Sequence, residues 1–430
     1  MQTPETNKEN KENKEKFFTT PLIIIYVTVF IDLIGFGMVI PILPFYAETT
    51  PFNATPFEIG ILFSVYSWMQ FFFSPILGKL SDKYGRRPIL FISLLGSAVG
   101  YFVIGFANTL VLVFIGRIIG GITGGNISTA QAYIADVTTR ENRAKGMGIF
   151  GAMFGLGFIL GPAIAGILSK YGVYVPFYFA AVLSLVNAIA LYFILPESLK
   201  QNVENIQNNL QNNLQKKRKG RFAEIFESLR DKRFGLITLV YFLLITAFSI
   251  MTYAFVLYTM FRFGYNAEQN GYLFAFIGLL AIIMQGALFS RLAERFGEAR
   301  LAVVGCLILV GSLFAVPFIG PNSGGLTGLL IGIACFSLGN SLASPALTSL
   351  ASKNAGENEQ GKTLGFLQSA ASLARAVGPT IGGVLLNNSV NKIDDFTLYR
   401  TFWTASAIMF AAFLAAAYFT KHGEKKKLVL

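Results

Sequence analysis

Residues 78–88 read GKLSDKYGRRP, a charged stretch within an apolar part of the chain. Five of these eleven residues are charged, whereas the flanking segments FSVYSWMQFFFSPIL and ILFISLLGSAVGYFVIGFA contain no charged residue. An apolar run of about 20 residues can cross the ~30 Å hydrocarbon core of a bilayer as a helix. The pattern therefore predicts two membrane-spanning helices joined by a short charged connection outside the bilayer.

The composition of the whole chain indicates an integral membrane protein. Of its 430 residues, 53% are hydrophobic and 13% are charged, and the mean hydropathy is +0.57. Soluble domains carry about 25% charged residues. This chain has too few charges to cover a soluble protein of its size, so its surplus apolar surface must face lipid. Its 43 glycines fit the same class, because small residues let membrane helices pack closely.

Several classes of site can be excluded. The two cysteines, Cys306 and Cys335, lie in apolar runs, and the single histidine, His422, lies in the polar C-terminal segment. We therefore expect no disulfide framework, no metal site and no histidine chemistry in the core. The chain has no P-loop motif and no constellation of catalytic side chains at membrane depth, so we expect neither direct use of ATP nor enzymatic activity.

Twelve apolar runs are long enough to span a bilayer. We expect them at residues 21–46, 57–78, 88–107, 109–135, 144–168, 174–195, 234–261, 268–290, 300–319, 324–350, 361–387 and 399–420. The predicted fold is all-α, with these helices in two pseudo-symmetric six-helix bundles, at residues 20–198 and 234–420.

The remaining segments are polar. Residues 1–19 are rich in Lys, Glu and Asn and predict a disordered tail, and residues 421–430 form a basic tail. The linker, residues 199–233, begins with a Gln/Asn-rich stretch that fits a flexible segment or a short amphipathic helix. It ends with RFAEIFESLRDKRF, which predicts an interfacial helix. The apolar face of that helix would comprise Phe222, Ile225, Phe226 and Leu229.

The distribution of Lys and Arg predicts the orientation. The net charge of +12 is concentrated in the connections after spans 2, 4, 6, 8 and 10 and in the C-terminal tail, whereas the alternate connections carry few cations. Because cationic loops stay in the cytoplasm, we expect both termini there, in the plasma membrane of a bacterium (its inner membrane). The same distribution argues against a nucleic-acid partner.

The two halves of the chain resemble each other. GKLSDKYGRRP matches SRLAERFGEAR (290–300), GGNISTAQAYIA matches LGNSLASPALTS, and GFILGPAIAGIL matches LARAVGPTIGGVL. These matches align Asp82 with Glu294, Asn126 with Asn340 and Gly161 with Gly378, at offsets of 212, 214 and 217 residues. Ordered matches at nearly one offset indicate a duplication of six spans. Parallel repeats of this kind build transporters whose halves rock about a central site.

These motifs resemble those of the major facilitator superfamily over residues 21–420. GKLSDKYGRRP is similar to the superfamily's signature between helices 2 and 3, and GLGFILGPAIAG (155–166) is similar to the Gly-Pro motif of proton-coupled antiporters. IDLIGFGMVIPILP (31–44), GRIIGGITGGN (116–126) and LPESL (195–199) are similar to the drug/proton antiporter branch, tetracycline/proton antiporters in particular. Those antiporters carry a histidine in helix 8 and an aspartate in helix 9. This chain has Ala281 and Leu309 there, which argues against tetracycline itself as the substrate.

The charged connection predicts a gate. Gly78 and Gly85 would allow a tight turn, and Asp82 and Arg86 have the i, i+4 spacing of a helical ion pair. Asp136, at the end of span 4, offers Arg86 a second carboxylate. The resemblance implies that this cluster latches the two halves together on the cytoplasmic side, with Asp82 at the N-terminus of the eleventh helix. The alternative is that the cations serve only to orient the protein.

Three ionisable residues fall deep within spans. They are Asp32 in span 1, Arg117 in span 4 and Arg375 in span 11. A charge at this depth is costly and normally faces a cavity or a partner. We expect Asp32 to carry the coupled proton, the alternative being a static partner of Arg117. Arg375 has three open roles: binding an anionic substrate, pairing with Asp32, or stabilising the interface between the halves.

Further residues complete the predicted site. The uncharged polar side chains expected near the substrate cavity are Gln70, Asn126, Gln131 and Asn340. The residues expected to form a hinge or seal are Gly157, Gly161, Pro162, Gly166, Gly378 and Pro379.

The predicted function is secondary active transport by alternating access. We expect proton-coupled efflux of small amphipathic compounds, of the multidrug or tetracycline-like kind, by a functional monomer that uses the proton gradient and no cofactor. The alternative within transport is a facilitator or symporter for a metabolite, with Asp32 in a structural role. A channel would not need a duplicated rocker with a charged latch. The expected partners are thus a small-molecule substrate, protons and the lipid bilayer.

Overall fold

The computed structural model describes residues 18–49, 51–139, 142–199, 232–354 and 360–425. Nearly all of the predicted N-terminal tail and of the predicted linker helix falls outside these residues. The last described helix, α17 (Asp395–Lys425), continues into the predicted C-terminal tail. The predictions for the two other polar segments therefore stay predictions.

Within the described residues, twelve helical segments are long and apolar enough to cross a membrane, which confirms the twelve predicted spans. The first six are α2 (Thr20–Glu48), α3 (Pro56–Tyr84), α4 (Arg86–Gly105), α5 (Leu110–Thr123) with α6 (Asn126–Val137), α7 (Arg143–Leu168) and α8 (Val175–Ile194). The second six are α11 (Lys232–Phe263), α12 (Ala267–Ile283) with a π-helical turn (Met284–Leu288) and α13 (Phe289–Phe296), α14 (Glu298–Ala315), α15 (Gly325–Asn354), α16 (Gln360–Leu386) and α17.

The charged stretch at residues 78–88 is itself helical for most of its length. The second span was predicted to end at residue 78, but α3 continues to Tyr84, and the connection to α4 is the single residue Gly85. Gly85 has φ +106°, a backbone conformation that residues with a side chain rarely adopt. The matching turn of the second half is Gly297, with φ +81°, between α13 and α14. This shared turn supports the predicted duplication.

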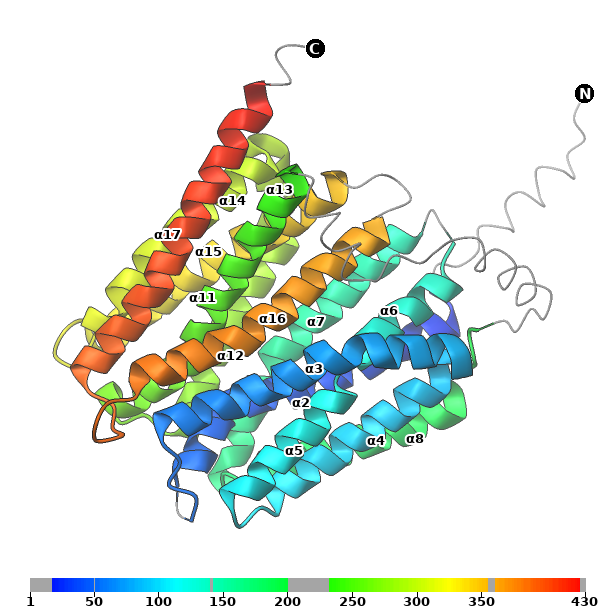
Figure 1. Cartoon of the computed structure of the whole chain (residues 1–430), viewed down its shortest axis with the longest axis horizontal. Coiled ribbons are helices and arrows are strands. Elements are labelled where there is room, and N and C mark those ends of the chain that lie inside the picture. The colour runs from blue at the N-terminus through cyan, green and yellow to red at the C-terminus, as the bar shows by residue number, and fades with distance from the viewer. Residues whose placement is uncertain (1–17, 50, 140–141, 200–231, 355–359, 426–430) are drawn as a thin grey trace, which may run out of the picture.

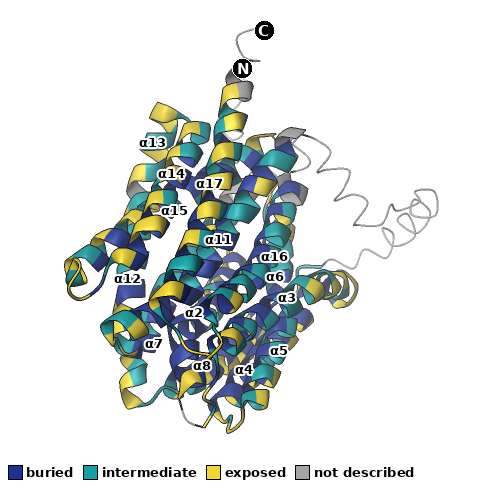
Figure 2. Cartoon of the chain, turned by 60° about the vertical axis from the view of Figure 1, so that its left-hand side comes forward, coloured by how far each residue is buried: buried dark blue, intermediate teal, exposed yellow. Residues whose placement is uncertain are grey.

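Burial follows the expectation for a membrane bundle. Figure 2 shows buried residues along the inner faces of the helices and exposed residues on their outward faces. Many of the exposed side chains are large and apolar, such as Phe193 (78% exposed), Val111 (66%) and Ile331 (60%). Water would not tolerate so much exposed apolar surface, so these faces must contact lipid.

The helices form two sets, α2–α8 and α11–α17, that meet along two crossings. α3 packs against α16, and α7 packs against α12. Figure 1 shows the two sets close together where α3 begins and α16 ends, and diverging toward the end where α3, α13 and α17 finish. We call the latter the basic end, because the Lys79–Arg87 stretch lies there, and the opposite one the far end.

Glycines allow the two sets to touch at the far end. A Cβ atom on Gly60 of α3 would lie 2.6 Å from the carbonyl oxygen of Pro379 in α16. A Cβ atom on Gly166 of α7 would lie 2.9 Å from Cα of Gly271 in α12. Real Cβ atoms are not found at such distances, so only glycine permits these backbones to approach so closely.

Polar contacts close the far end further. The ammonium of Lys170 lies 2.9 Å from a carboxylate oxygen of Glu268 in the other set, and the Thr380 hydroxyl donates to Ser64 Oγ at 2.8 Å. The Tyr253 hydroxyl donates to the carbonyl oxygen of Pro56. The two halves are thus held together at the far end and separate toward the basic end.

We expect Gly166→Leu to lower the midpoint of thermal unfolding of the purified protein. Its side chain would meet backbone atoms of α12, and overpacking of this kind costs about 1–3 kcal/mol. Gly155→Leu, on the same helix, is the matched control, because a Cβ atom there has no neighbour within 4 Å. Equal midpoints for the two variants would show that the α7–α12 crossing does not need a glycine.

Candidate functional site

Asp32 lies in the middle of α2 and is partly accessible to solvent. Its Oδ2 atom accepts a hydrogen bond from the side-chain amide of Asn126, at 3.1 Å. The sequence suggested Arg117 as the neighbour of Asp32. This is wrong for the present conformation, because no ion pair between described residues joins these two side chains. Asp32 is thus a carboxylate with a neutral partner.

Asn126 reaches Asp32 because the fourth span is broken. α5 ends at Thr123, α6 begins at Asn126, and Gly124 and Gly125 between them are not helical. A break of this kind frees backbone groups that must find partners inside the protein. The side-chain amide of Gln70 donates to the Gly124 carbonyl oxygen at 2.8 Å.

Two serine side chains bond the other free carbonyl oxygen of this break, that of Gly125. The Ser128 hydroxyl donates to the Gly125 carbonyl oxygen at 3.0 Å, and that of Ser74 does so at 3.5 Å. Gln70 was predicted to line the substrate cavity, but it is only 6% exposed. It supports the backbone that positions Asn126, so its place in the predicted cavity is corrected.

Arg117 is also a buried residue. It is 3% exposed, and its Nε–H donates to the carbonyl oxygen of Leu62 at 3.0 Å. Its guanidinium lies 4.4 Å from the ring centroid of Tyr66, within the range of a cation–π interaction. Arg117 therefore fastens α5 to α3, and its predicted place in the substrate cavity is corrected as well.

Arg375 is the third predicted charge, and it differs from Arg117. It lies on α16, is partly accessible, and donates to Ser372 Oγ at 3.1 Å. It interacts electrostatically with Tyr241 of its own half and with Tyr66 of the other half. None of the ion pairs between described residues involves Arg375, so the predicted pairing with Asp32 is not present here.

Gln131 and Asn340 are partly accessible residues within α6 and α15. The described residues offer neither of them a side-chain hydrogen bond, so both amide groups remain free to meet a ligand. Tyr66, on α3, is a further residue at this site. The guanidinium of Arg117 lies 4.4 Å from its ring centroid, and the ring centroid of Phe36, one helical turn from Asp32, lies 5.2 Å from it.

The predicted hinge or seal residues divide into two groups. Gly157, Gly161 and Pro162 pack against α2 within the first half, where Gly157 contacts Leu33, the neighbour of Asp32. Gly378 packs in the same way on α11 within the second half. The other two predicted residues, Gly166 and Pro379, take part in the crossings between the halves at the far end. Pro162 does so as well, because its carbonyl oxygen would lie 2.9 Å from a Cβ atom on Gly271 of α12.

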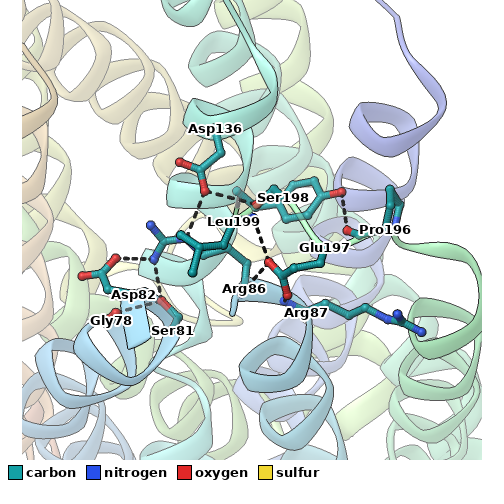
Figure 3. Close-up of polar contacts among 11 residues, drawn as sticks. Gly78, Ser81, Asp82, Arg86, Arg87, Asp136, Pro196, Glu197, Ser198 and Leu199 are labelled. Atoms are coloured by element: carbon teal, nitrogen blue, oxygen red, sulfur yellow. Dashed lines mark hydrogen bonds and ion pairs between the residues drawn. The ribbon is translucent and has the colours of Figure 1, made fainter. Parts of the chain in front are cut away.

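The predicted gate residues meet at the basic end (Figure 3). Arg86 Nη1 lies 2.5 Å from Asp82 Oδ1, and Arg86 Nε lies 3.1 Å from Asp136 Oδ2, as the spacing predicted. The Arg86 side chain is 9% exposed, whereas that of Asp82 is 65% exposed. Gly78 lies inside α3, and a Cβ atom there would make an ordinary contact at 3.8 Å, so the expected need for a glycine at this position is corrected.

Two residues after span 6 complete this cluster, and the sequence analysis missed their role. The Glu197 carboxylate accepts hydrogen bonds from the backbone N–H groups of Arg86 (2.9 Å) and Arg87 (3.1 Å), at the N-terminus of α4. A carboxylate is favourable there because helix N-termini carry partial positive charge. The Ser198 hydroxyl donates to Asp136 Oδ2 at 3.1 Å. The signal was visible in LPESL (195–199), which was used only for its resemblance.

The predicted latch across the halves is not formed among the described residues. The side chain of Asp82 pairs with Arg86 of its own half, and the basic ends of α3 and α16 are apart. In the equivalent turn of the second half the residue after the glycine carries the opposite charge. There Glu298 follows the glycine, accepts from the Ser349 hydroxyl at 3.2 Å and pairs with Lys353.

Comparison with known proteins agrees with this architecture. Residues 25–379 and 328–429 match the family described as Major Facilitator Superfamily. The chain is 32% identical to the class H tetracycline resistance protein of Pasteurella multocida, over 95% of this chain and 98% of that protein. It is 29% identical to multidrug resistance protein 2 of Bacillus subtilis (strain 168), over 86% of this chain and 90% of that protein.

A solved structure shares the same fold. A bacterial homologue of the human lysosomal transporter Spinster, in an inward-facing and unoccupied conformation, superposes with a TM-score of 0.71 at 15% identity. The match covers 95% of this chain and 99% of that one. With twelve spans, two related halves and a family match across nearly its whole length, this chain belongs to the Major Facilitator Superfamily of membrane transporters.

Proposed function

We propose that this chain exports small amphipathic compounds in exchange for protons, by alternating access and as a monomer. Asp32 would carry the proton, the proton gradient would supply the energy, and no cofactor or chemical conversion of the compound is needed. The names of the relatives, tetracycline and multidrug resistance proteins, support the compound class. Ala281 and Leu309 argue against tetracycline itself, as set out above.

The observation that carries this proposal is the setting of Asp32. A carboxylate at this depth is costly when ionised, and a cationic partner would keep it ionised. Its hydrogen-bond partner is the neutral amide of Asn126, and its side chain is partly accessible. Such a carboxylate can gain a proton at little cost and lose it when a substrate offers compensating charge or hydrogen bonds. Competition between proton and substrate for one residue is the minimum that exchange requires.

The arrangement of the halves supports an inward-facing state. The positive-inside rule assigns the basic end to the cytoplasm, and with it both termini, in a bacterial inner membrane. The far end, which faces outward in this orientation, is closed by the Gly60–Pro379 and Gly166–Gly271 contacts and the Lys170–Glu268 ion pair. The substrate would enter from the cytoplasm between the diverging halves.

The gate would act in the opposite state. When the basic ends approach each other, the exposed Asp82 carboxylate would come to the N-terminus of α16, where a helix dipole favours an anion. Arg86, Asp136 and Glu197 would hold the α3–α4 turn in position for this contact. The latch therefore stabilises the outward-facing state in this proposal.

We expect Asp32→Asn to abolish gradient-driven transport and to leave substrate exchange intact. Asn resembles the protonated carboxyl group but cannot release a proton. The measurement is accumulation of tetracycline, ethidium and tetramethylrhodamine in inverted vesicles, with and without a pH gradient, and counterflow without one. Asp32→Glu, which keeps a titratable group, is the control.

Gradient-driven accumulation by Asp32→Asn at the wild-type rate would remove Asp32 from the mechanism. Wild-type counterflow without any effect of the gradient would indicate the alternative, a facilitator.

We expect Asp82→Asn to slow the transport cycle without weakening substrate binding. The loss of a charge at a helix N-terminus costs about 1–2 kcal/mol, which corresponds to about a 5- to 30-fold lower turnover if that contact limits the cycle. Turnover is measured as the initial efflux rate at saturating substrate. Substrate binding is followed as the substrate concentration that gives half of this maximal rate. Glu294→Gln, at the equivalent position of the second half, is the matched control. Normal turnover of Asp82→Asn, or equal slowing of both variants, would refute the latch.

A further inference from the structure

Arg375 stands out as a cation whose neighbours do not neutralise it. A guanidinium has five N–H donors. The described residues provide one hydrogen-bond acceptor for it, the hydroxyl of Ser372. The other electrostatic neighbours of Arg375 are the phenols of Tyr241 and Tyr66. No carboxylate of the described part of the chain forms an ion pair with it.

Arg117 is the natural comparison, because it too lies within a membrane span. Arg117 is sealed from solvent, rests on the ring of Tyr66 and donates to a backbone carbonyl oxygen. Arg117 thus also has a single hydrogen-bond acceptor, but it is closed off from solvent and its guanidinium is covered by an aromatic ring. Arg375 has no such carbonyl partner among the described residues, and its side chain stays partly accessible. An arginine that is both accessible and unneutralised inside a bundle is suited to an anion that comes and goes.

The position of Arg375 places such an anion between the two halves. Arg375 lies one helical turn from Pro379, which touches Gly60 at the closed far end. Next to Pro379, the Thr380 hydroxyl donates to Ser64 Oγ of α3 at 2.8 Å. The ring of Tyr66, two residues further along α3, has its centroid 5.2 Å from that of Phe36, which lies one helical turn from Asp32 on α2. α3 thus contacts both of the helices that carry these two charges, and a ligand between the halves would meet Arg375 on α16 and Asp32 on α2.

We propose that Arg375 binds a carboxylate of the transported compound, so that the substrates are amphipathic zwitterions. The inference rests on the proposed function and names its substrate class. The planar guanidinium can hold a carboxylate with two parallel hydrogen bonds. The cationic group of the same compound would approach Asp32 and favour loss of its proton. A purely anionic compound would instead bind best when Asp32 is protonated, which opposes exchange, so both charges are needed.

A matched pair of dyes tests this proposal. Tetramethylrhodamine carries a xanthylium cation and a free carboxylate, and its methyl ester carries the cation alone. We expect the purified full-length protein to bind the free carboxylate form at least about tenfold more tightly, the effect of one charge-assisted hydrogen bond. Binding is followed by fluorescence polarisation at constant pH in detergent.

Three variants assign the preference to Arg375. Arg375→Gln should remove the preference for the free carboxylate dye and leave binding of the methyl ester unchanged. Unchanged binding of the ester also shows that the variant is folded. Arg375→Lys should keep part of the preference, because the charge remains but the two-pronged geometry is lost. Ser372→Ala, which keeps the guanidinium, should retain the preference. The proposal is overturned if wild-type protein binds both dyes equally, prefers the ester or binds neither, or if Arg375→Gln keeps the preference.

This experiment is independent of proton coupling. It measures equilibrium binding without a membrane or a gradient, so loss of the proposed exchange in the Asp32 experiment would leave its outcome unchanged. Conversely, proton-driven transport of ethidium with no carboxylate preference would overturn the zwitterion proposal and leave proton exchange in place.

Discussion

The structure depends on one constraint: inside a bilayer, every charge and every freed backbone group must find its partner within the protein. The break at Gly124–Gly125 is tolerated because Gln70 and two serines bond its carbonyl oxygens. Arg117 is tolerated because a carbonyl oxygen and an aromatic ring surround it. Where this satisfaction is incomplete, at Asp32 and Arg375, the residues are also partly accessible. Asp32 and Arg375, the two charges proposed to act in transport, differ in their accessibility from the buried Arg117.

The same constraint explains how the charged turn at the basic end is built. Arg86 is nearly buried, and it is neutralised by carboxylates from α3 and from α6. Glu197, after the sixth span, accepts from the backbone N–H groups of Arg86 and Arg87. The ends of three spans of the first half therefore meet at Arg86, two at its guanidinium and one at its backbone. The repeated turn at Gly297 keeps the backbone conformation but reverses the charge, with Glu298 opposite Lys353. The two copies thus share the backbone conformation of the turn but differ in the sign of the charge that follows the glycine.

The sequence predicts the local features of this protein well. Hydropathy located all twelve spans, and the i, i+4 spacing of Asp82 and Arg86 predicted their ion pair. It did not predict that α3 would continue to Tyr84, because hydropathy carries no information once a helix has left the bilayer. Arg117, offered as the alternative partner of Asp32, does not pair with it in this structure, where the partner is Asn126. The hydrogen bond between Asn126 and Asp32 depends on the break in the fourth span. The sequence did not predict this break, because a Gly-Gly pair inside a helix can also indicate close packing against a neighbouring helix. Glu197 was missed because its partners are backbone groups 110 and 111 residues away in the chain.

The glycine contact between α3 and α16 has a mechanical consequence. Because the two backbones touch at Gly60 with no side chain between them, this point can serve as a fulcrum for the helix. From Gly60 to Tyr84 the lever arm is about 36 Å long at 1.5 Å per residue. A tilt of about ten degrees at the fulcrum would therefore carry the tip of α3 through about 6 Å. Small angular changes at a tight pivot are enough to part or join the opposite ends of the molecule.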